Sequence, residues 1–243
     1  MTKLTIDIYA DGANVDEMLD ALKKPYIKGF TTNPTLMHKA GLTDYRAFAV
    51  NVLTHIRELP ISFEVFSDDF DEMERQARLI DSWGPNVYVK IPVTNTHGEF
   101  AGKVIASLAS DGIKLNVTAL LTVDQVRQVA ATLDPATPAI VSVFAGRIAD
   151  TGIDPLPIMK AALKILEDLP NAKLLWASPR ELLNLVQADQ MGCHVVTVTP
   201  DILKKLPLLD KDLTQFSLET VQMFHDDAQK AGFSLPTGVV AKL

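Results

Sequence analysis

Short apolar runs rich in β-branched residues alternate along the chain with longer segments that have the 3.6-residue period of a helix. Turn residues or helix-start residues bound each run, so we expect a strand at each of these places. The eight expected strands are 5–10, 28–32, 61–66, 87–91, 113–118, 139–144, 173–177 and 194–198. The expected helices are 15–23, 45–58, 70–83, 99–110, 123–133, 155–166, 179–191 and 213–231.

Eight strands, each followed by a helix, in a chain of 243 residues predict an α/β fold of the (β/α)₈ TIM-barrel type. An open, doubly wound sheet is the alternative, and the even spacing of the eight units favours the closed barrel. No Pro/Gly/Ser-rich linker divides the chain. We therefore expect a single barrel domain over 1–243, with a C-terminal helix at 213–231 and a tail at 233–243.

The composition of the chain restricts its partners and its compartment. Lys and Arg number 23 against 30 Asp and Glu, and the resulting net charge of −7 does not favour a nucleic-acid partner. The single cysteine, Cys193, excludes an internal disulfide framework. No apolar run approaches the ~20 residues of a membrane span, and the start of the chain has no apolar signal core. We expect a cytoplasmic protein without a membrane partner.

Polar residues recur at the carboxyl ends of the expected strands, where barrel enzymes carry their sites. Lys90 lies near the end of one strand, and lysines are rarely fully buried unless they are paired or chemically used. Residues two apart share one face of a strand. On this parity, the residues expected at the mouth are Asp11, Thr31, Asn33, Ser62, Glu64, Lys90, Asn116, Thr118, Ser142, Phe144, Trp176 and Ser178.

Each of these residues also has an ordinary structural interpretation. Lys90 can form an ion pair with Glu64 or extend its charged end to water. Asp11 can cap a turn, and Asn33, which precedes a proline, can cap the helix that follows. Ser178 has the spacing of a capping box to a later glutamate, ahead of the helix expected at 179. The coincidence of such residues on matching strand ends favours a functional site.

The sequence lacks the motifs of several competing chemistries. Its histidines have no HxH or HExxH spacing, so we expect no metal site, and no GxGxxG or Walker loop is present. A Ser-His-Asp arrangement is not supported by any histidine motif. The remaining chemistry is that of an amine in a desolvated barrel, where a lysine can attack a carbonyl group.

Six segments of the chain, in order, are similar to the motifs of a known family. They are 11–14, 29–36, 89–94, 112–118, 142–147 and 176–180. The Thr-Thr-Asn-Pro motif at 31–34 and the Lys-Ile-Pro motif at 90–92 are specific as a pair. On these residues the chain resembles the transaldolases, and more closely their short-chain branch, which includes the fructose-6-phosphate aldolases.

The resemblance implies a (β/α)₈ barrel that uses no cofactor and performs class I aldol chemistry on sugar phosphates as a homo-oligomer. Lys90 would form the Schiff base and Asp11 would move protons. Glu64 and Thr118 would hold the catalytic water. The residues implied in substrate binding are Thr32, Asn33, Asn116 and Phe144, with Arg147, Ser178 and Arg180 for the phosphate.

The resemblance also separates two activities. Transaldolases pair a glutamate with a phenylalanine at the positions of Glu64 and Phe144, where fructose-6-phosphate aldolases pair a glutamine with a tyrosine. The pair in this chain predicts a transaldolase of the pentose phosphate pathway type, which moves a dihydroxyacetone unit between sugar phosphates. The alternatives are an aldolase that releases free dihydroxyacetone and a barrel that binds a sugar phosphate without catalysis. The donor, the acceptor and the anionic group, phosphate or sulfonate, stay open.

Overall fold

Eight parallel strands close into a barrel in the computed structural model, which describes residues 4–235. Each strand pairs with the next one in the chain, and the last strand pairs with the first. The strands are β1 (Asp7–Asp11), β2 (Ile27–Thr31), β3 (Ile61–Glu64), β4 (Val87–Pro92), β5 (Leu115–Leu120), β6 (Ala139–Val143), β7 (Ala172–Trp176) and β8 (Val195–Val198). The predicted (β/α)₈ barrel is confirmed, because all eight strands form at the expected places.

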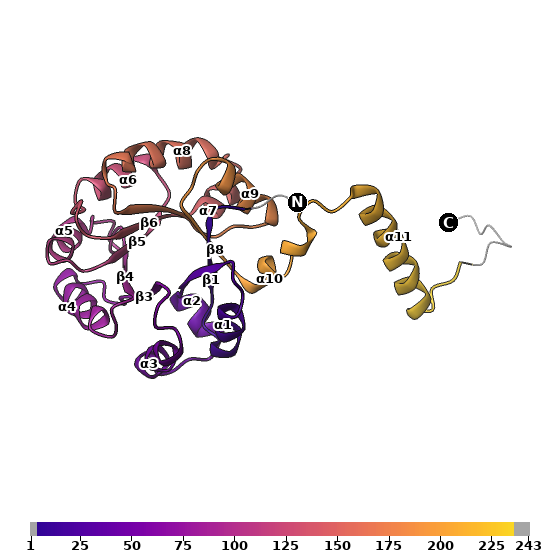
Figure 1. The fold of residues 1–243 in the computed structure, drawn as a ribbon, viewed down its shortest axis with the longest axis horizontal. Coiled ribbons are helices and arrows are strands. Elements are labelled where there is room, and N and C mark those ends of the chain that lie inside the picture. Colours follow the sequence, from indigo (N-terminus) through magenta and orange to yellow (C-terminus); the bar gives the residue numbers. More distant parts are fainter. Residues whose placement is uncertain (1–3, 236–243) are drawn as a thin grey trace. The chain divides into compact units, whose positions relative to one another are not determined.

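The longer helices of the barrel unit lie around the outside of the ring of strands (Figure 1). The helices of the barrel are α1 (Val15–Leu22), α2 (Pro34–Lys39), α3 (Tyr45–His55), α4 (Phe70–Asp81), α5 (Gly102–Ser110), α6 (Val123–Ala130), α7 (Ala145–Asp150), α8 (Leu156–Ile165), α9 (Leu182–Gln190) and α10 (Pro200–Leu203). Of the short helices, α2 was expected only as the helix that Asn33 could cap, and α7 and α10 were not among the expected ranges. They follow β2, β6 and β8 within a few residues, at the end of the barrel where the candidate site lies.

Side-chain caps fix where several helices begin. At α6, the Thr122 hydroxyl accepts from the Gln125 N–H at 3.2 Å, and the Gln125 side chain accepts in return from the Thr122 N–H at 3.1 Å. This reciprocal pair satisfies two N–H groups that the helix leaves without partners. At α4, the Asp69 carboxylate accepts from the Glu72 N–H at 2.9 Å. Such caps each stabilise a helix by roughly 0.5–2 kcal/mol.

The expectation for the start of α9 was wrong. The helix begins at Leu182 rather than at 179, so Ser178 is not its N-cap. Ser178 has a left-handed backbone with φ of 57°, which turns the chain away from the helical path. The Asn184 side chain accepts from the Arg180 N–H at 2.7 Å and from the Glu181 N–H at 3.1 Å.

The interior of the barrel is filled by alternate residues of the strands. Its cluster of large side chains includes Tyr9, Leu175 and Val195. Gly29 makes room for Tyr9, because a Cβ atom at Gly29 would lie 2.5 Å from the tyrosine ring. The expected inward position of Trp176 was wrong. Ser142 on β6 pairs with Leu175 on β7, so Leu175 faces inward and Trp176 packs, fully buried, on the opposite face.

The segment from Lys205 onward forms a second compact unit, separate from the barrel unit that ends at Lys204. It contains a short 3₁₀ turn (Leu206–Leu208) and α11 (Leu213–Lys230), which confirms the helix expected at 213–231. Asp212 caps α11 by accepting from the Gln215 N–H at 2.8 Å. The single domain over 1–243 stays a prediction, and most of the expected tail, residues 236–243, lies outside the described residues.

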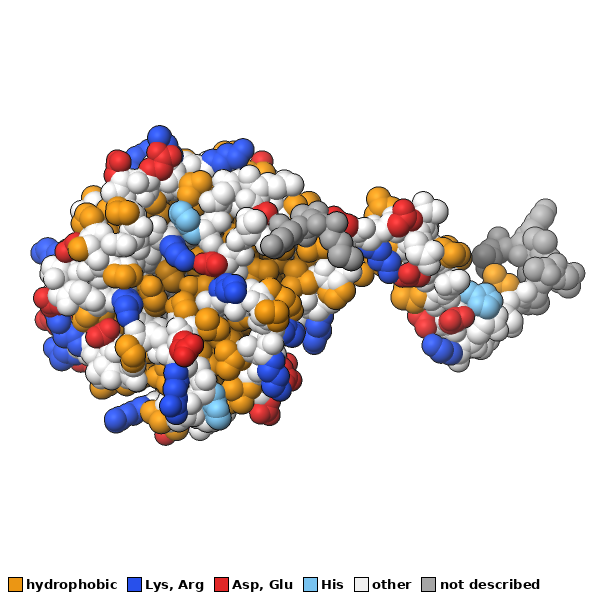
Figure 2. All heavy atoms as spheres, viewed as in Figure 1, with side chains coloured by type: hydrophobic (Ala, Val, Ile, Leu, Met, Phe, Trp, Pro, Cys, Tyr) orange, Lys and Arg blue, Asp and Glu red, His pale blue; other side chains and the backbone are white. Residues whose placement is uncertain are grey.

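Hydrophobic side chains gather toward the middle of the barrel face seen in Figure 2, whereas charged side chains of both signs are interspersed around its margin. Within residues 4–235, every helix is too short or too polar to cross a bilayer.

Candidate active site

A cavity of about 420 Å³ opens at the carboxyl ends of the strands, where the polar ring was expected. Nine of the eleven predicted site residues line it. They are Asp11, Asn33, Glu64, Lys90, Asn116, Thr118, Phe144, Arg147 and Ser178. The other two, Thr32 and Arg180, do not line the cavity, although the backbone of Thr32 contacts the amine of Lys90.

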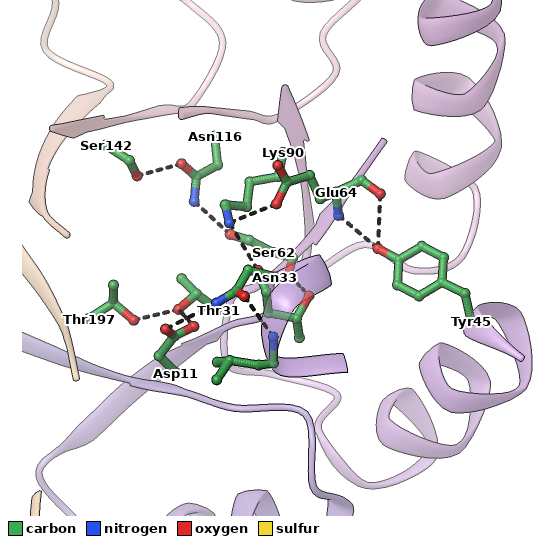
Figure 3. A network of polar contacts seen from close by, with 12 residues as sticks. Asp11, Thr31, Asn33, Tyr45, Ser62, Glu64, Lys90, Asn116, Ser142 and Thr197 are labelled. Carbon is green, nitrogen blue, oxygen red and sulfur yellow. Dashed lines mark hydrogen bonds and ion pairs between the residues drawn. The ribbon is translucent and has the colours of Figure 1, made fainter. Parts of the chain in front are cut away.

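Lys90 projects from β4 into this cavity and is only 6% exposed. Its Nζ atom donates to the Thr32 carbonyl oxygen and to Glu64 Oε2, both at 3.0 Å (Figure 3). Glu64 lies directly opposite Lys90 in the register of β3 and β4. The ion pair that sequence analysis offered as the ordinary interpretation is therefore present. It lies inside the cavity, where a lysine amine and a carboxylate can exchange a proton.

Asp11 ends β1 and is held by two hydrogen-bond donors from the β2 end. Thr31 Oγ1 donates to one carboxylate oxygen at 2.8 Å, and Asn33 Nδ2 donates to the other at 3.3 Å. Burial raises the pKa of Asp11 above its usual value, against the opposing effects of Lys90 and the two donors. A carboxylate of this kind is suited to accept a proton at a reacting centre.

Asn33 also accepts from the Leu36 N–H at 2.9 Å, so it caps α2 as expected. One side of its amide therefore fixes the start of a helix, and the other side contacts Asp11. A hydroxyl that was not predicted as part of the site completes this network. Thr197 on β8 forms a hydrogen bond with Thr31 Oγ1. Because the single proton of Thr31 is donated to Asp11, Thr197 must be the donor in that contact.

A second network crosses the floor of the cavity. Asn116 is completely buried; its Nδ2 donates to Ser62 Oγ at 2.9 Å, and its Oδ1 accepts from Ser142 Oγ at 2.6 Å. Ser62 and Ser142 were expected on the polar ring but were not predicted as site residues. Thr118, two residues along β5, is also buried. Its hydroxyl has no hydrogen-bond partner among the residues that the structure describes. An unsatisfied hydroxyl beside a cavity is suited to bind water or substrate.

The cations expected to bind a phosphate differ in their surroundings. Arg147, on α7, lines the cavity and places its guanidinium 5.1 Å from the centre of the Phe144 ring. Arg180 is exposed, and its guanidinium forms an ion pair with Asp150 in which Nε donates to Oδ1 at 2.9 Å. Arg147 therefore lies at the cavity and Arg180 does not line it, and the phosphate role of both stays a prediction.

Ser178 lines the cavity because of its backbone conformation. The register of β7 directs Leu175 and Ala177 into the barrel, so Ser178 would face outward if the strand continued. Its left-handed φ of 57° breaks that alternation. Gly146 permits the turn, because a Cβ atom at this position would lie 1.5 Å from the Ser178 carbonyl oxygen.

Sequence reasoning missed Thr197 and Tyr45. Thr197 left a signal, since it is a polar residue on an otherwise apolar strand, at the parity that faces inward. Tyr45 left none. It starts α3, and only the three-dimensional structure shows that its hydroxyl contacts the backbone of Glu64. Within residues 4–235, the His, Cys, Asp and Glu side chains form no group that could hold a metal ion.

The chain is thus a closed (β/α)₈ barrel with a buried, paired lysine and a carboxylate at its mouth. Residues 8–235 match the family described as transaldolase/fructose-6-phosphate aldolase. The chain therefore belongs to that family.

Individual relatives agree over nearly the full length of the chain. A probable transaldolase of Dehalococcoides mccartyi is 34% identical over 213 residues, which cover 86% of this chain and 95% of the relative. A probable transaldolase of Thermoanaerobacter sp. is 34% identical over 230 residues, which cover 93% and 99%. A crystal structure of dihydrodipicolinate synthase from Rhodopseudomonas palustris shares the fold alone, with a TM-score of 0.54 and 14% identity over 80% of this chain and 70% of that one.

Proposed function

We propose that the protein is a transaldolase that moves a dihydroxyacetone unit between sugar phosphates through a Schiff base on Lys90. The observation that carries the proposal is the placement of the Lys90 amine. It is buried at the end of β4, held by the Thr32 carbonyl and by Glu64, and lines one cavity together with Asp11. A lysine is rarely fully buried unless it is paired or chemically used, and the amine of Lys90, although paired with Glu64, also faces the cavity. Membership of a family described by both transaldolase and fructose-6-phosphate aldolase supports the same chemistry.

The reaction begins when the neutral amine of Lys90 attacks the ketone of the donor sugar and forms a carbinolamine. Glu64 Oε2, 3.0 Å from Nζ, is in position to take a proton from the amine and to return one to the departing hydroxyl. Loss of that hydroxyl as water leaves an iminium ion. The hydroxyl of Thr118, without a partner among residues 4–235, is available to hold the water.

Asp11 then takes the proton of the hydroxyl next to the scissile bond. The electrons of that O–H bond form the aldehyde carbonyl, and the electrons of the broken C–C bond move into the iminium to give an enamine on Lys90. The raised pKa of Asp11 suits a base that must keep this proton until it is returned. The enamine attacks the acceptor aldehyde, Asp11 gives the proton back, and hydrolysis of the new iminium frees Lys90.

The rest of the cavity supplies groups for a polyhydroxylated, anionic substrate. The amides of Asn33 and Asn116 suit the hydroxyls of the donor. Arg147 lies at the cavity as a planar cation, which can bind a phosphate through two parallel hydrogen bonds. Ser178 adds a hydroxyl at the same wall.

Borohydride trapping tests the proposal. Incubation with fructose 6-phosphate and borohydride is expected to attach the three-carbon unit irreversibly to Lys90, and peptide mass spectrometry locates it. Lys90→Ala is expected to abolish trapping and turnover. Lys173→Ala is the matched control, because Lys173 also belongs to a barrel strand but pairs with Asp7 at 2.9 Å. Trapping of Lys90→Ala at the wild-type rate contradicts the assignment, and no trapping of the wild type favours a barrel that only binds.

A second assay distinguishes transfer to an acceptor from the release of free dihydroxyacetone. Phe144 carries no hydroxyl to activate a hydrolytic water, which favours transfer over release. We therefore expect cleavage of fructose 6-phosphate to require an acceptor such as erythrose 4-phosphate. Equally fast cleavage without any acceptor makes the free aldolase the better description.

A further inference from the structure

The pairing between β2 and β3 stops at Thr31, the last residue of β2, and at Ser62, two residues before the end of β3. Only Phe30 with Ile61 and Thr31 with Ser62 are in register. Two backbone hydrogen bonds have their donors on the β2 side. The Phe30 N–H donates to the Pro60 carbonyl at 2.8 Å, and the Thr32 N–H donates to the Ser62 carbonyl at 3.2 Å. Bonds in a parallel ladder alternate in direction along the strands. The next bond would therefore run from the Glu64 N–H to the Thr32 carbonyl.

Both groups of that bond have other partners. The Thr32 carbonyl accepts from Lys90 Nζ at 3.0 Å. The Glu64 N–H donates to the hydroxyl of Tyr45 at 2.7 Å, and the same hydroxyl donates to the Glu64 carbonyl at 3.1 Å (Figure 3). The bond after that one would need an N–H from residue 34, which is Pro34 and has none. Strand β2 thus has no N–H to offer the Glu64 carbonyl.

We propose that Tyr45 is a positioning residue for the reacting amine. Its hydroxyl takes the place of the ladder bond that β2 does not make, and so leaves the Thr32 carbonyl to hold Lys90. It also fixes the backbone of Glu64, the residue that contacts that amine. The inference rests on the proposed Schiff-base function, and it adds a residue of α3 that does not itself line the cavity.

The surroundings of Tyr45 keep its ring and its proton in place. The ring packs edge-on against Phe63, with centroids 6.1 Å apart, and against Trp83 at 5.5 Å. A third ring, Phe66, lies at 4.6 Å. Burial raises the pKa of Tyr45 above its usual value, so the phenol stays neutral wherever the enzyme is folded near neutral pH. Only the neutral phenol can donate to a carbonyl and accept from an N–H at the same time.

Tyr45→Phe tests the inference, because it removes the hydroxyl and keeps the ring. The Glu64 N–H is then expected to turn to the Thr32 carbonyl and compete with Lys90 for it. We expect the rate constant of imine formation, measured by borohydride trapping in single turnover, to fall about tenfold or more, while KM changes little. Tyr88→Phe is the matched control, since it removes a tyrosine hydroxyl from β4 at a residue that does not line the cavity, and it should leave the rate unchanged.

A double-mutant cycle with Glu64→Gln separates positioning from a general loss of stability. If Tyr45 acts through Glu64, its removal is expected to cost clearly less in the Glu64→Gln background than in the wild type. A Tyr45→Phe rate equal to that of the wild type overturns the inference, and full additivity overturns the part of it that acts through the Glu64 side chain. Trapping of the wild type distinguishes a failure of the proposed Schiff-base function from a failure of the positioning role of Tyr45. No imine in the wild type contradicts the proposed function, whereas an imine that is indifferent to Tyr45 contradicts only its positioning role.

Discussion

The two ends of the cavity are built differently. At the end that holds the amine, the functional side chains come from β1 to β5 and are locked by hydrogen bonds to one another. Lys90, Asp11 and Asn116 each have at least two such contacts. At the end expected to hold the phosphate, Arg147 and Arg180 come from α7 and from the segment before α9, and both are exposed.

This difference matches the demands of two tasks. Bond making needs groups fixed to within a fraction of an ångström, which packed strands and a full set of hydrogen bonds provide. Binding a phosphate needs positive charge, and an exposed arginine on a short helix supplies it with less constraint. We therefore expect substitutions at the first end to act on the rate of the chemical steps and substitutions at the second end to act on substrate affinity.

The largest expected effect is at Asp11. Asp11→Asn keeps the size of the side chain but removes the base that cleaves the C–C bond. Cleavage is expected to fall by about 10²–10⁴-fold, the usual contribution of a general base. Imine trapping with the donor should persist, because Asp11 acts after the imine forms. Loss of both activities to the same degree would place Asp11 in imine formation or in folding.

The pH dependence of wild-type cleavage provides a control for this assignment. Asp11 must be ionised to take the proton, so activity is expected to fall as the pH drops through its pKa. Because burial raises that pKa, the loss should occur at a higher pH than for an ordinary aspartate. The residual activity of Asp11→Asn should lack this step.

An intermediate effect is expected for the two arginines. Arg147→Ala removes a cation at the cavity, and loss of a charge-assisted contact costs about 1.5–3 kcal/mol, or roughly tenfold or more in KM for phosphorylated donors. Arg180→Ala should cost less, because Asp150 already neutralises that guanidinium. Unphosphorylated dihydroxyacetone should be little affected by either change. Equal losses on phosphorylated and unphosphorylated donors would remove the phosphate role.

Asp150→Asn is the matched variant for this comparison. It keeps the shape of the Arg180 partner but removes its charge, so it should lower KM for phosphorylated donors if Arg180 can reach the phosphate. An unchanged KM, together with no effect of Arg180→Ala, would limit the anion site to Arg147.

The same contrast explains how much could be predicted from the sequence. The period-two alternation of strands brought Asp11, Glu64 and Lys90 to one cavity, since the register of a closed barrel fixes which residues face inward. The alternation failed at β7. There the strand parity was misassigned at Trp176, and the left-handed backbone of Ser178 then broke the alternation.

Contacts that depend on how helices and loops pack, rather than on the register of the strands, could not be predicted. The pairing of Arg180 with Asp150 depends on how the segment after β7 lies against α7, which local patterns do not encode. The hydroxyl of Tyr45 reaches Glu64 from a neighbouring helix. Periodicity indicates which face a residue occupies, but not which backbone group on another element is left without a partner.

The smallest effect is expected for Phe144. It tests whether this residue protects the covalent intermediate on Lys90 from hydrolysis. Phe144 lines the cavity, and the Arg147 guanidinium lies over its ring. Phe144→Tyr adds one hydroxyl that can hydrogen-bond the hydrolytic water, which should speed release of the three-carbon unit. We expect a several-fold rise in dihydroxyacetone formation from fructose 6-phosphate without an acceptor.

The control for this variant is the transfer reaction itself. With erythrose 4-phosphate present, Phe144→Tyr should retain most of its transfer rate, because the imine and the C–C cleavage depend on Lys90 and Asp11. A fall in transfer without any rise in release would mean that the ring only packs against Arg147. A rise in release alone would show that the absence of a hydroxyl at Phe144 keeps the covalent intermediate intact until an acceptor arrives.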